Sequence, residues 1–451
     1  MADIVSCKEN KEIFHQGGVL DKRYILDAKI GKGGFSHVWS AINDTNGDKV
    51  AIKIYKPFRD NFSYFEHEIR VLRAIHRSCT ENIEDIEVDD EDLHVKSTKM
   101  QKKCNKSKKN RTKLNTNKID NFYSIEEKNA RLVNYRDTFD VLYCKTSRNH
   151  FHRYNTRILR YPCIVYEQLG QDLDKFMENL DSGLPYDLAK RILKEVTTGL
   201  KYLHKANLIH NDIKPDNVFI IKPYDQIIES EDVSVKLGDF GAAIFEDKIH
   251  SCRLGTDGYR SPEMLFTDLT NISCESDIWS LGMLFYYLIT NEHMLDDITE
   301  MVMIGEEAED SFFESDSTES DSEMSDDESE EIIPDEKLDS VLVELHKIEK
   351  IFGKIPNLYK RGKLYDDLCR DGKLYPISRY GFCEELKPEG VVKLGDFLEN
   401  NYDIDALTAG NISELILKMV KYKPEKRASL KELMLDLEKR SPSQLSMSPL
   451  L

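Results

Sequence analysis

The stretch "HNDIKPDNVF", residues 210 to 219, holds three polar side chains whose types and spacing suit phosphoryl transfer. Asp212, Lys214 and Asn217 follow the pattern D-x-K-x-x-N. A carboxylate at Asp212 can orient an attacking hydroxyl and accept its proton. Lys214 can neutralise charge on the moving phosphoryl group, and Asn217 can ligate a metal ion. Each residue alone would fit an ordinary polar turn.

Other segments supply the remaining parts of such a site. Asp239 lies in the turn "LGDFGAA", where a carboxylate can chelate Mg²⁺ that bridges phosphates. In "GKGGFSHVW", Gly31 and Gly33 let backbone N–H groups approach phosphate without a Cβ in the way. Lys53 ends the apolar strand "VAIK", and Glu68 lies on the next predicted helix, where it can hold Lys53 against the α- and β-phosphates. A glycine turn, a surface lysine and a solvated helix face are the alternatives; the order of all the parts favours phosphoryl transfer.

Hydrophobic periodicity predicts the elements that position these residues. Residues 24 to 56 alternate apolar and polar, which indicates three strands around a glycine turn. "SYFEHEIRVLRAI" has helical spacing, and "ARLVNYRDTFDVLYC" and "YPCIVYEQLG" restore strand character. From "DLAKRILKEVTTGLKYLH" onward the pattern is helical, with Leu188, Ile192, Val196, Leu200 and Leu203 on one stripe. This order predicts an α+β fold with two lobes.

Two charged segments interrupt this pattern. Within 79–128, residues 81 to 92 hold eight acids, and residues 96 to 118 hold ten Lys or Arg. Residues 296 to 336 hold nineteen acids and no Lys or Arg, which accounts for the whole net charge of −19. We predict that both are disordered inserts. The basic block could instead be a nuclear-import signal or an RNA contact, and the acidic block could attract arginine-rich substrates.

Composition narrows the class of protein. The 451 residues are 40% apolar and 32% charged. The start "MADIVSCKENKEIFHQGG" lacks the pattern of a signal peptide, and the longest apolar stretch is shorter than the ~20 residues of a membrane span. Nine cysteines without a C-x-x-C pair argue against a disulfide framework and a zinc site. We therefore expect a protein of the cytoplasm and/or nucleus with no membrane partner.

Over residues 24 to 440, apart from the inserts, the chain resembles a eukaryotic protein kinase. "GTDGYRSPE", "SDIWSLG" and "PEKR" fall where that family has its substrate-side loop, its central helix and its closing arginine. The resemblance implies a bilobed protein-kinase-like fold with a small, mostly β N-lobe (24–167) and a larger, mostly α C-lobe (168–440). Residues 1–23 would be an N-terminal extension and 441–451 a tail.

The resemblance also implies serine/threonine kinase activity with ATP and Mg²⁺. Glu263 should pair with Arg427, and Asp277 should brace the backbone of the catalytic loop. The implied catalytic residues are Asp212, Lys214, Lys53, Glu68 and Thr256, the last contacting Asp212, with Asn217 and Asp239 as metal ligands. The implied nucleotide pocket is formed by Ile30, Gly31, Gly33, Gly34, Phe35, Ser36, Val38, Ala51, Lys53, Glu167 and Leu169, with Tyr166 at its rear.

Asn211 departs from the family, in which most members carry arginine at this position. In many kinases that arginine grips a phosphate on the activation segment, and asparagine cannot make such a bidentate charged contact. The four residues that do the chemistry, Lys53, Asp212, Asn217 and Asp239, are all present. We therefore predict a kinase that is active without phosphorylation of this segment. The competing hypothesis is a pseudokinase scaffold that binds partners through its charged segments.

Several features together resemble the SR-protein kinases. These are Ser36 at the third glycine position, the non-arginine residue 211, "EQLGQDL" after the hinge, and the tail from "IFGKIPNLYKRGKLYDDL" to "YKPEKRAS". The resemblance implies protein substrates rich in Arg and Ser. Arg260 is typical of the broader group of cyclin-dependent, MAP, SR-protein and LAMMER kinases. A LAMMER-type kinase is the alternative, because "DFG-A-x-F-x-D-x-x-H" is also echoed here, although E-H-L-A-M-M-E-R is missing.

A docking groove is one point of difference from SR-protein kinases. Their two acidic groove positions correspond here to Val343 and Lys350, and Glu344 and Glu349 stand beside them, so a modified groove is a possible arrangement. We expect a monomer. Direct nucleic-acid binding is not expected, since the basic block has no interleaved aromatic residues.

Overall fold

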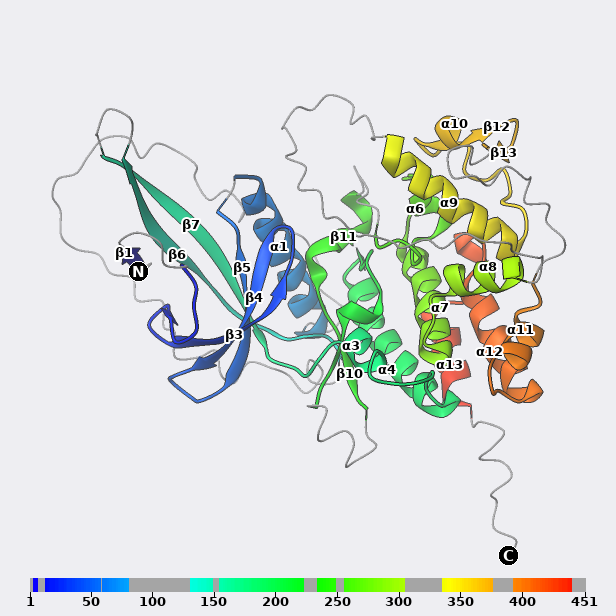
Figure 1. Ribbon diagram of the computed structural model, residues 1–451, viewed down its shortest axis with the longest axis horizontal. Coiled ribbons are helices and arrows are strands. Elements are labelled where there is room, and N and C mark those ends of the chain that lie inside the picture. The colour runs from blue at the N-terminus through cyan, green and yellow to red at the C-terminus, as the bar shows by residue number, and fades with distance from the viewer. Residues whose placement is uncertain are drawn as a thin grey trace, which may run out of the picture. The chain divides into compact units, whose positions relative to one another are not determined.

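A computed structural model of the chain describes residues 3–6, 13–57, 59–80, 130–148, 154–222, 233–248, 255–304, 335–375 and 392–439. By its internal contacts the chain divides into two compact units, shown in Figure 1: Met1–Pro57 with Leu72–Glu167, and Phe58–Val71 with Gln168–Leu451. One division falls between Glu167 and Gln168, where the sequence analysis separated the lobes. Helix α1 (Arg59–Thr80) contributes residues to both units.

The first unit is built on one sheet in the order β1-β6-β7-β5-β4-β3-β2. Its strands are β1 (Asp3–Ser6), β2 (Val19–Leu20), β3 (Tyr24–Lys32), β4 (Ser36–Asn43), β5 (Lys49–Tyr55), β6 (Tyr135–Arg148) and β7 (Tyr154–Glu167). Neighbouring strands are antiparallel, except for β1, which runs parallel to β6. The three strands predicted for residues 24 to 56 are confirmed as β3, β4 and β5. Residues of the N-terminal extension add β1 and β2.

The alternation of β5 places one set of side chains in the core and another on the opposite face. Val50, Ile52 and Ile54 are fully buried, whereas Ala51 and Lys53 between them are half-buried. Successive residues of a strand point to opposite faces of its sheet. Ala51 and Lys53 therefore share the face of the sheet opposite to the buried side chains of Val50, Ile52 and Ile54.

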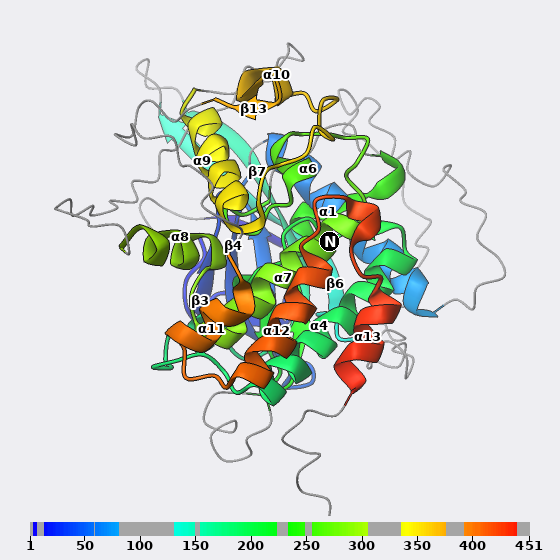
Figure 2. The same ribbon diagram turned by 90° about the vertical axis from the view of Figure 1, so that its right-hand side faces the viewer.

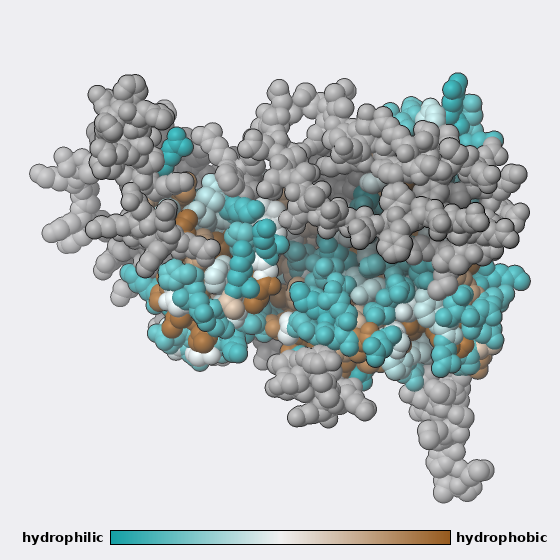
Figure 3. All heavy atoms as spheres, in the orientation of Figure 1, coloured by the Kyte–Doolittle hydropathy of each residue, from teal (hydrophilic) through white to brown (hydrophobic). Residues whose placement is uncertain are grey.

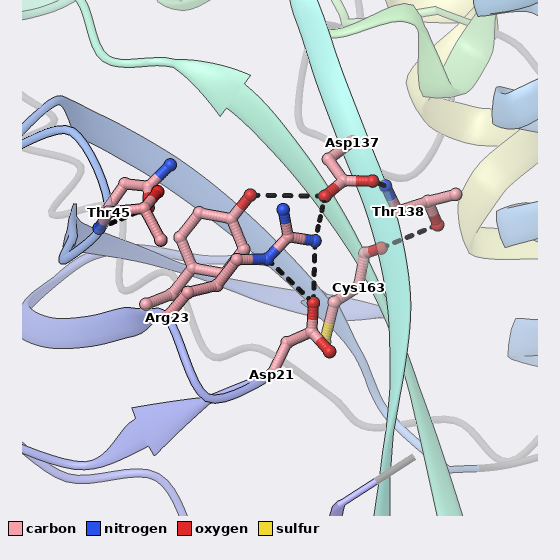
Figure 4. A network of polar contacts seen from close by, with 8 residues as sticks. Asp21, Arg23, Thr45, Asp137, Thr138 and Cys163 are labelled. Carbon is pink, nitrogen blue, oxygen red and sulfur yellow. Dashed lines mark hydrogen bonds and ion pairs between the residues drawn. The ribbon is translucent and has the colours of Figure 1, made fainter. Parts of the chain in front are cut away.

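A polar network fastens the turn before β3 to strand β6 (Figure 4). Arg23 donates from Nε to Asp21 at 2.9 Å and also pairs with Asp137. The Tyr24 hydroxyl donates to Asp137 at 3.3 Å. Burial is the main cause that raises the pKa of this phenol, and Asp137 adds to it. The network joins residues more than a hundred positions apart in the sequence.

The second unit contains most of the helices. These are α3 (Leu173–Met177), α4 (Tyr186–Lys205), α6 (Pro262–Leu265), α7 (Cys274–Thr290), α8 (Met294–Ile304), α9 (Asp335–Phe352), α10 (Tyr365–Leu368), α11 (Leu394–Asn401), α12 (Ala406–Met419) and α13 (Leu430–Glu438). Short strands and 3₁₀ turns connect them: β8 (Leu208–Ile209), η2 (Pro215–Asn217), β9 (Val218–Ile220), β10 (Val235–Leu237), η3 (Phe240–Ala242), β11 (Ile244–Phe245), η4 (Glu246–Lys248), β12 (Cys369–Arg370), β13 (Lys373–Leu374) and η5 (Pro424–Lys426).

Helix α7 is the central element of this unit, with α4 and α12 packed against it (Figure 2). It is buried along nearly its whole length, and Trp279 and Tyr286 are fully enclosed. The predicted stripe of α4 is confirmed for Ile192, Val196, Leu200 and Leu203, which are fully buried, whereas Leu188 is half-buried. The buried residues of α4 are therefore part of the core next to the loop that follows this helix.

The predicted bounds of both charged inserts need correction. Residues 296–304 belong to helix α8, where Ile298 is fully buried and Asp297 accepts hydrogen bonds from the hydroxyls of Tyr286 and Tyr402. The two hydroxyl donors offset the free-energy cost of burying the Asp297 carboxylate. A prediction from the number of acids alone was therefore wrong for residues 296–304. Residues 79 and 80 end helix α1, with Cys79 buried. Residues 335 and 336 begin helix α9. The other insert residues, 81–128 and 305–334, lie outside the described residues, so their disorder stays a prediction.

The described surface is largely hydrophilic on the face shown in Figure 3. Three of the most exposed large apolar side chains of the described residues, Val19, Ile158 and Leu407, lie on three different elements. Within the part of the chain that the structure describes, no helix is both long and apolar enough to cross a bilayer.

Gly282 permits the close approach of α7 to the end of α12. A Cβ at this position would lie 2.8 Å from Cγ1 of Val420 and 3.1 Å from Cβ of Met419. We expect Gly282→Ala to lower the free energy of unfolding by about 1–3 kcal/mol, because the packed helices must separate. Urea denaturation followed by circular dichroism measures this.

The matched control is Gly410→Ala on α12. Gly410 is exposed, and a Cβ there would meet no atom within 4 Å. Alanine should stabilise this helix by about 0.5–1 kcal/mol. Equal effects of the two substitutions would contradict the close helix packing.

Candidate active site

Four side chains of the second unit converge at the catalytic-loop sequence. Asp212 Oδ1 accepts from Thr256 Oγ1 at 2.7 Å and from Thr256 N at 3.2 Å. Asp212 Oδ2 accepts from Asn217 Nδ2 at 2.9 Å. Lys214 Nζ donates to Thr256 Oγ1 at 2.8 Å and lies 3.7 Å from Asp212 Oδ2. The contact expected between Thr256 and Asp212 is therefore present.

This arrangement can accept a proton and stabilise negative charge in one place. Both oxygens of Asp212 are oriented by neutral hydrogen-bond donors, and the side chain is partly open to solvent. A carboxylate held in this way is suited to act on a hydroxyl placed beside it. The Lys214 ammonium supplies positive charge at the same point.

Asp277, in the first turn of α7, holds the backbone of this loop. Its carboxylate accepts from the backbone N–H groups of His210 at 2.8 Å and Asn211 at 2.9 Å. His204 Nε2 donates to the same carboxylate at 2.9 Å. The expected bracing is present, and the contribution of His204 was not predicted.

His210 connects the loop to the strand end before Asp239. The ring is fully buried; Nε2 contacts the carbonyl of Gly238 at 3.0 Å, and Asp212 N donates to Nδ1 at 3.3 Å. These contacts fit the tautomer with the proton on Nε2. Sequence reasoning assigned His210 no role, and its position two residues before Asp212 was the only signal.

Asn211 has a left-handed backbone, with φ of 66°. Asparagine is among the few residues other than glycine that adopt this conformation readily. Its Nδ2 donates to the carbonyl of Ala242 at 3.2 Å, in the segment that follows Asp239. The residue that departs from the family therefore contacts that segment through an uncharged amide.

The oxygen-bearing groups expected to hold Mg²⁺ come from adjoining loops. Asn217 donates from Nδ2 to the Asp212 carbonyl at 2.7 Å, so its Oδ1 is the atom that a hard cation would use. Asp239 is exposed in a left-handed turn, and Gly238 N donates to the Asn217 carbonyl at 2.9 Å. Among the described residues no group of three or more His, Cys, Asp or Glu could hold a metal ion. One carboxylate and one amide fit Mg²⁺, which takes few protein ligands and completes its shell with phosphates and water.

In the first unit, the glycine-rich turn joins β3 to β4. Gly31 lies opposite Val38, and a Cβ on Gly31 would be 3.3 Å from the Val38 Cβ. Gly33 N donates to the Ser36 carbonyl at 2.9 Å, and Gly34 has open space around it. The turn therefore leaves room for a ligand close to the backbone of Gly34.

The other nucleotide-side residues of this unit occupy neighbouring positions. Lys53 on β5 pairs in register with Val38 on β4, and Ala51 shares its face. Oε1 of Glu167 accepts from Asn134 N at 2.7 Å. Ile30 and Phe35 are exposed, and Tyr166 is half-buried. Glu68 and Leu169 belong to the second unit, so the Lys53–Glu68 ion pair and the complete pocket stay predictions.

The ion pair predicted between Glu263 and Arg427 is present and fully buried. Arg427 donates to Oε1 of Glu263 at 2.6 Å and to Oε2 at 2.8 Å, and both side chains have 0% exposure. Ser276 also donates to Glu263, at 2.7 Å. The Arg427 guanidinium lies 5.3 Å from the ring centroid of Trp279 on α7. This pair fastens α6, which follows residues 255–260 (the substrate loop), to the unit's core.

Comparison with known proteins identifies the family. A family model described as a protein kinase domain matches residues 102–436. The chain belongs to the protein kinase family. The matched range contains the catalytic loop, Asp239 and the Glu263–Arg427 pair of the kinase domain. It begins after Gly31 and Lys53, so their assignment rests on the sequence pattern.

Individual relatives of the kinase domain are MAP kinases and AFC kinases. The chain is 24% identical over 304 residues to "Serine/threonine-protein kinase AFC1" of Arabidopsis thaliana, a match that covers 63% of this chain and 51% of the relative. It is 30% identical over 266 residues to "Mitogen-activated protein kinase 14" of the same plant, covering 59% of this chain and 54% of the relative. The chain therefore spans about half the length of these relatives. The relatives support the group of cyclin-dependent, MAP and LAMMER kinases.

A modified docking groove on α9 of the kinase domain stays a prediction, and the two acids beside the groove positions bind within the chain. Glu344 is buried and binds Arg260, and Glu349 Oε1 accepts from Ile355 N at 2.8 Å. Both acids hold the protein's own chain. Val343 and Lys350 are half-buried and carry no negative charge.

We expect Glu263→Gln to lower the free energy of unfolding by about 3–5 kcal/mol, because Arg427 would remain buried without its ionic partner. The matched control is Glu438→Gln, which removes an exposed partner 3.2 Å from Lys194. The control should change the free energy of unfolding by less than about 0.5 kcal/mol. Urea denaturation compares the two variants, and similar small effects would contradict a structural role for the buried pair.

Proposed function

We propose that this kinase domain transfers the γ-phosphate of Mg·ATP to serine or threonine hydroxyls of proteins. The observation that carries the proposal is the hydrogen-bonded set of Asp212, Lys214, Asn217 and Thr256. It places a proton acceptor, a cation and a metal-ligand oxygen around one point. The AFC relatives, which are named serine/threonine-protein kinases, support the same activity.

In the proposed mechanism the protein mainly positions its substrates. Asp212 orients the substrate hydroxyl and accepts its proton, while Lys214 stabilises charge on the transferred group. Asn217 and Asp239 would hold Mg²⁺, which supplies positive charge to the phosphates. Lys53 orients the α- and β-phosphates, held by Glu68. The backbone around Gly34 covers the phosphates.

We also propose that the kinase domain is active without phosphorylation of its activation segment, residues 239–263. Two contacts to backbone carbonyls hold the start of this segment: Asn211 donates to the Ala242 carbonyl, and His67 Nε2 lies 2.6 Å from the Ala243 carbonyl. Beyond them β11 pairs antiparallel with β8. These contacts support order in residues 239–248, the described start of the segment, without a phosphate.

For substrates, we propose proteins rich in Arg and Ser. The support is the SR-protein kinase resemblance of the glycine-rich turn, residue 211 and the C-terminal sequence. A LAMMER-type kinase directed to proline or arginine is the alternative. The acidic docking groove is not part of the proposal, since Glu344 and Glu349 bind within the protein. We further propose that the protein acts as a monomer in the cytoplasm or nucleus.

Phosphate transfer from labelled Mg·ATP tests the activity. The substrates are an Arg-Ser repeat peptide, a Ser-Pro peptide and an acidic peptide, with Asp212→Ala as control. We expect strong labelling of the Arg-Ser peptide and a loss of at least about 100-fold in the control. Transfer to the Ser-Pro peptide alone would favour the alternative substrate class. Tight ATP binding without transfer to any peptide would favour the pseudokinase scaffold.

Phosphatase treatment should leave the activity of the wild-type protein within about twofold, because Asn211 offers no charged grip for a phosphate.

A comparison of Asn211→Gly with Asn211→Ala separates the amide contact from backbone strain. Glycine adopts the left-handed conformation without cost, whereas alanine should lose about 1–2 kcal/mol of stability. Reduced activity in both variants would support the amide contact. Full activity of Asn211→Gly would contradict a role for the amide contact. Inactivation by phosphatase would contradict activity without phosphorylation of the segment.

A further inference from the structure

The substrate loop, "GTDGYR" at residues 255–260, is held by a carboxylate that lies 84 residues further along the chain. Glu344 on α9 accepts from the Gly258 backbone N–H at 3.0 Å through Oε1. Its Oε2 accepts from Arg260 Nε at 2.9 Å and from Arg260 NH2 at 2.5 Å. One carboxylate thus binds both the backbone and a side chain of the same loop.

Both members of this pair are buried: Arg260 is 5% exposed and Glu344 is 6% exposed. Arg260 also contacts Asp257 at 2.6 Å, but that carboxylate is 73% exposed. Charge-assisted hydrogen bonds are stronger than neutral ones, and two N–H groups of Arg260 converge on the single oxygen Oε2 of Glu344. Glu344 is therefore the partner that fixes the position of the guanidinium.

The geometry of the loop makes this contact relevant to the reaction. Gly258 has φ of 81°, a backbone conformation that L side chains rarely adopt. Two residues earlier, Thr256 donates to Asp212 at 2.7 Å. On the other side, the Tyr259 carbonyl accepts from Ser280 Oγ of α7 at 2.7 Å. A change at Gly258 would therefore be transmitted to Thr256 beside the proton acceptor.

A buried ion pair by itself is weak evidence for stability, because desolvation offsets most of its attraction. Such pairs are better attested as devices that select one arrangement of a chain. Here the carboxylate selects one conformation of the loop that lies against Asp212. A phosphate on the segment is not needed to supply this negative charge.

We propose that Glu344 is a positioning residue, a carboxylate built into α9 that holds the substrate loop in the conformation that receives the protein substrate. The inference rests on the proposed kinase function. It assigns the acid a role in substrate acceptance through Gly258 and Arg260, without contact with ATP or the reacting atoms.

Charge on Glu344 should then control peptide phosphorylation near neutral pH. Burial raises the pKa of Glu344 to about 7, and Arg260 opposes the rise. The anion is therefore present above this value and is lost as the pH falls through it. Asp257 and Arg260 are the charged groups of the loop near it; Lys347, which pairs with Asp296 of α8, and His346 lie elsewhere on α9. Loss of the anion should loosen the loop at low pH.

Steady-state kinetics of Glu344→Gln tests the role, with Glu349→Gln as the same substitution on the same helix. We expect kcat/KM for the peptide to fall about 10-fold in Glu344→Gln, with the KM for ATP unchanged. Between pH 6 and 8 the wild type should lose peptide kcat/KM on the acidic side, and Glu344→Gln should lose this pH dependence. Arg260→Ala should cause a similar fall in kcat/KM for the peptide. In the double variant, the fold-decrease in kcat/KM should be smaller than the product of the two single fold-decreases.

Hydrogen exchange provides a readout that does not require catalysis. In Glu344→Gln, the amides of residues 255–260 should exchange faster, while those of 208–218 and the thermal midpoint stay close to wild type. Unchanged exchange together with unchanged peptide kinetics would overturn the proposal. An inactive wild type with faster exchange in the variant would refute the proposed function but retain the role of Glu344 in the loop.

Discussion

The contact between Asp277 and two successive backbone N–H groups is the constraint on which the active-site geometry depends. The acid lies in the first turn of α7, where the helix dipole favours negative charge, and α7 is buried along nearly its whole length. The N–H groups of His210 and Asn211 both point to it, which sets the path of the chain into Asp212. A helix buried in the core therefore fixes the position of Asp212, the proposed proton acceptor.

Three buried acids from three helices act on the loops in a similar way. Asp277 of α7 binds the catalytic loop, Glu344 of α9 binds the substrate loop, and Glu263 of α6 binds Arg427. Each carboxylate accepts at least two hydrogen bonds, which offset the cost of burying its charge. Loops that lack regular backbone pairing are thereby held by helices that have it.

Much of the scaffold follows from local patterns. The alternation of residues 24 to 56 and the stripe of α4 are periodic signals of strands and helices, and both elements are present. The bounds of the acidic segment were misjudged at Asp297, because the tyrosine hydroxyls that satisfy it come from other helices. Contacts such as that of His67 with Ala243, 176 residues away, have no spacing signal at all. Glu263 and Arg427 are 164 residues apart, and their pairing was anticipated only through the family resemblance.

Asn211, which has a left-handed backbone, contacts the activation segment through its side-chain amide, and this has a consequence for how the segment responds to ionic strength. A grip between arginine and phosphate is electrostatic and weakens as salt is added. The amide of Asn211 makes a neutral hydrogen bond to the Ala242 carbonyl, and the His67 ring contacts the next carbonyl. Neutral hydrogen bonds depend little on ionic strength. The order of residues 239–248, the described start of this segment, should therefore be largely the same in dilute buffer and in concentrated salt, whatever the salt does to the binding of a charged substrate.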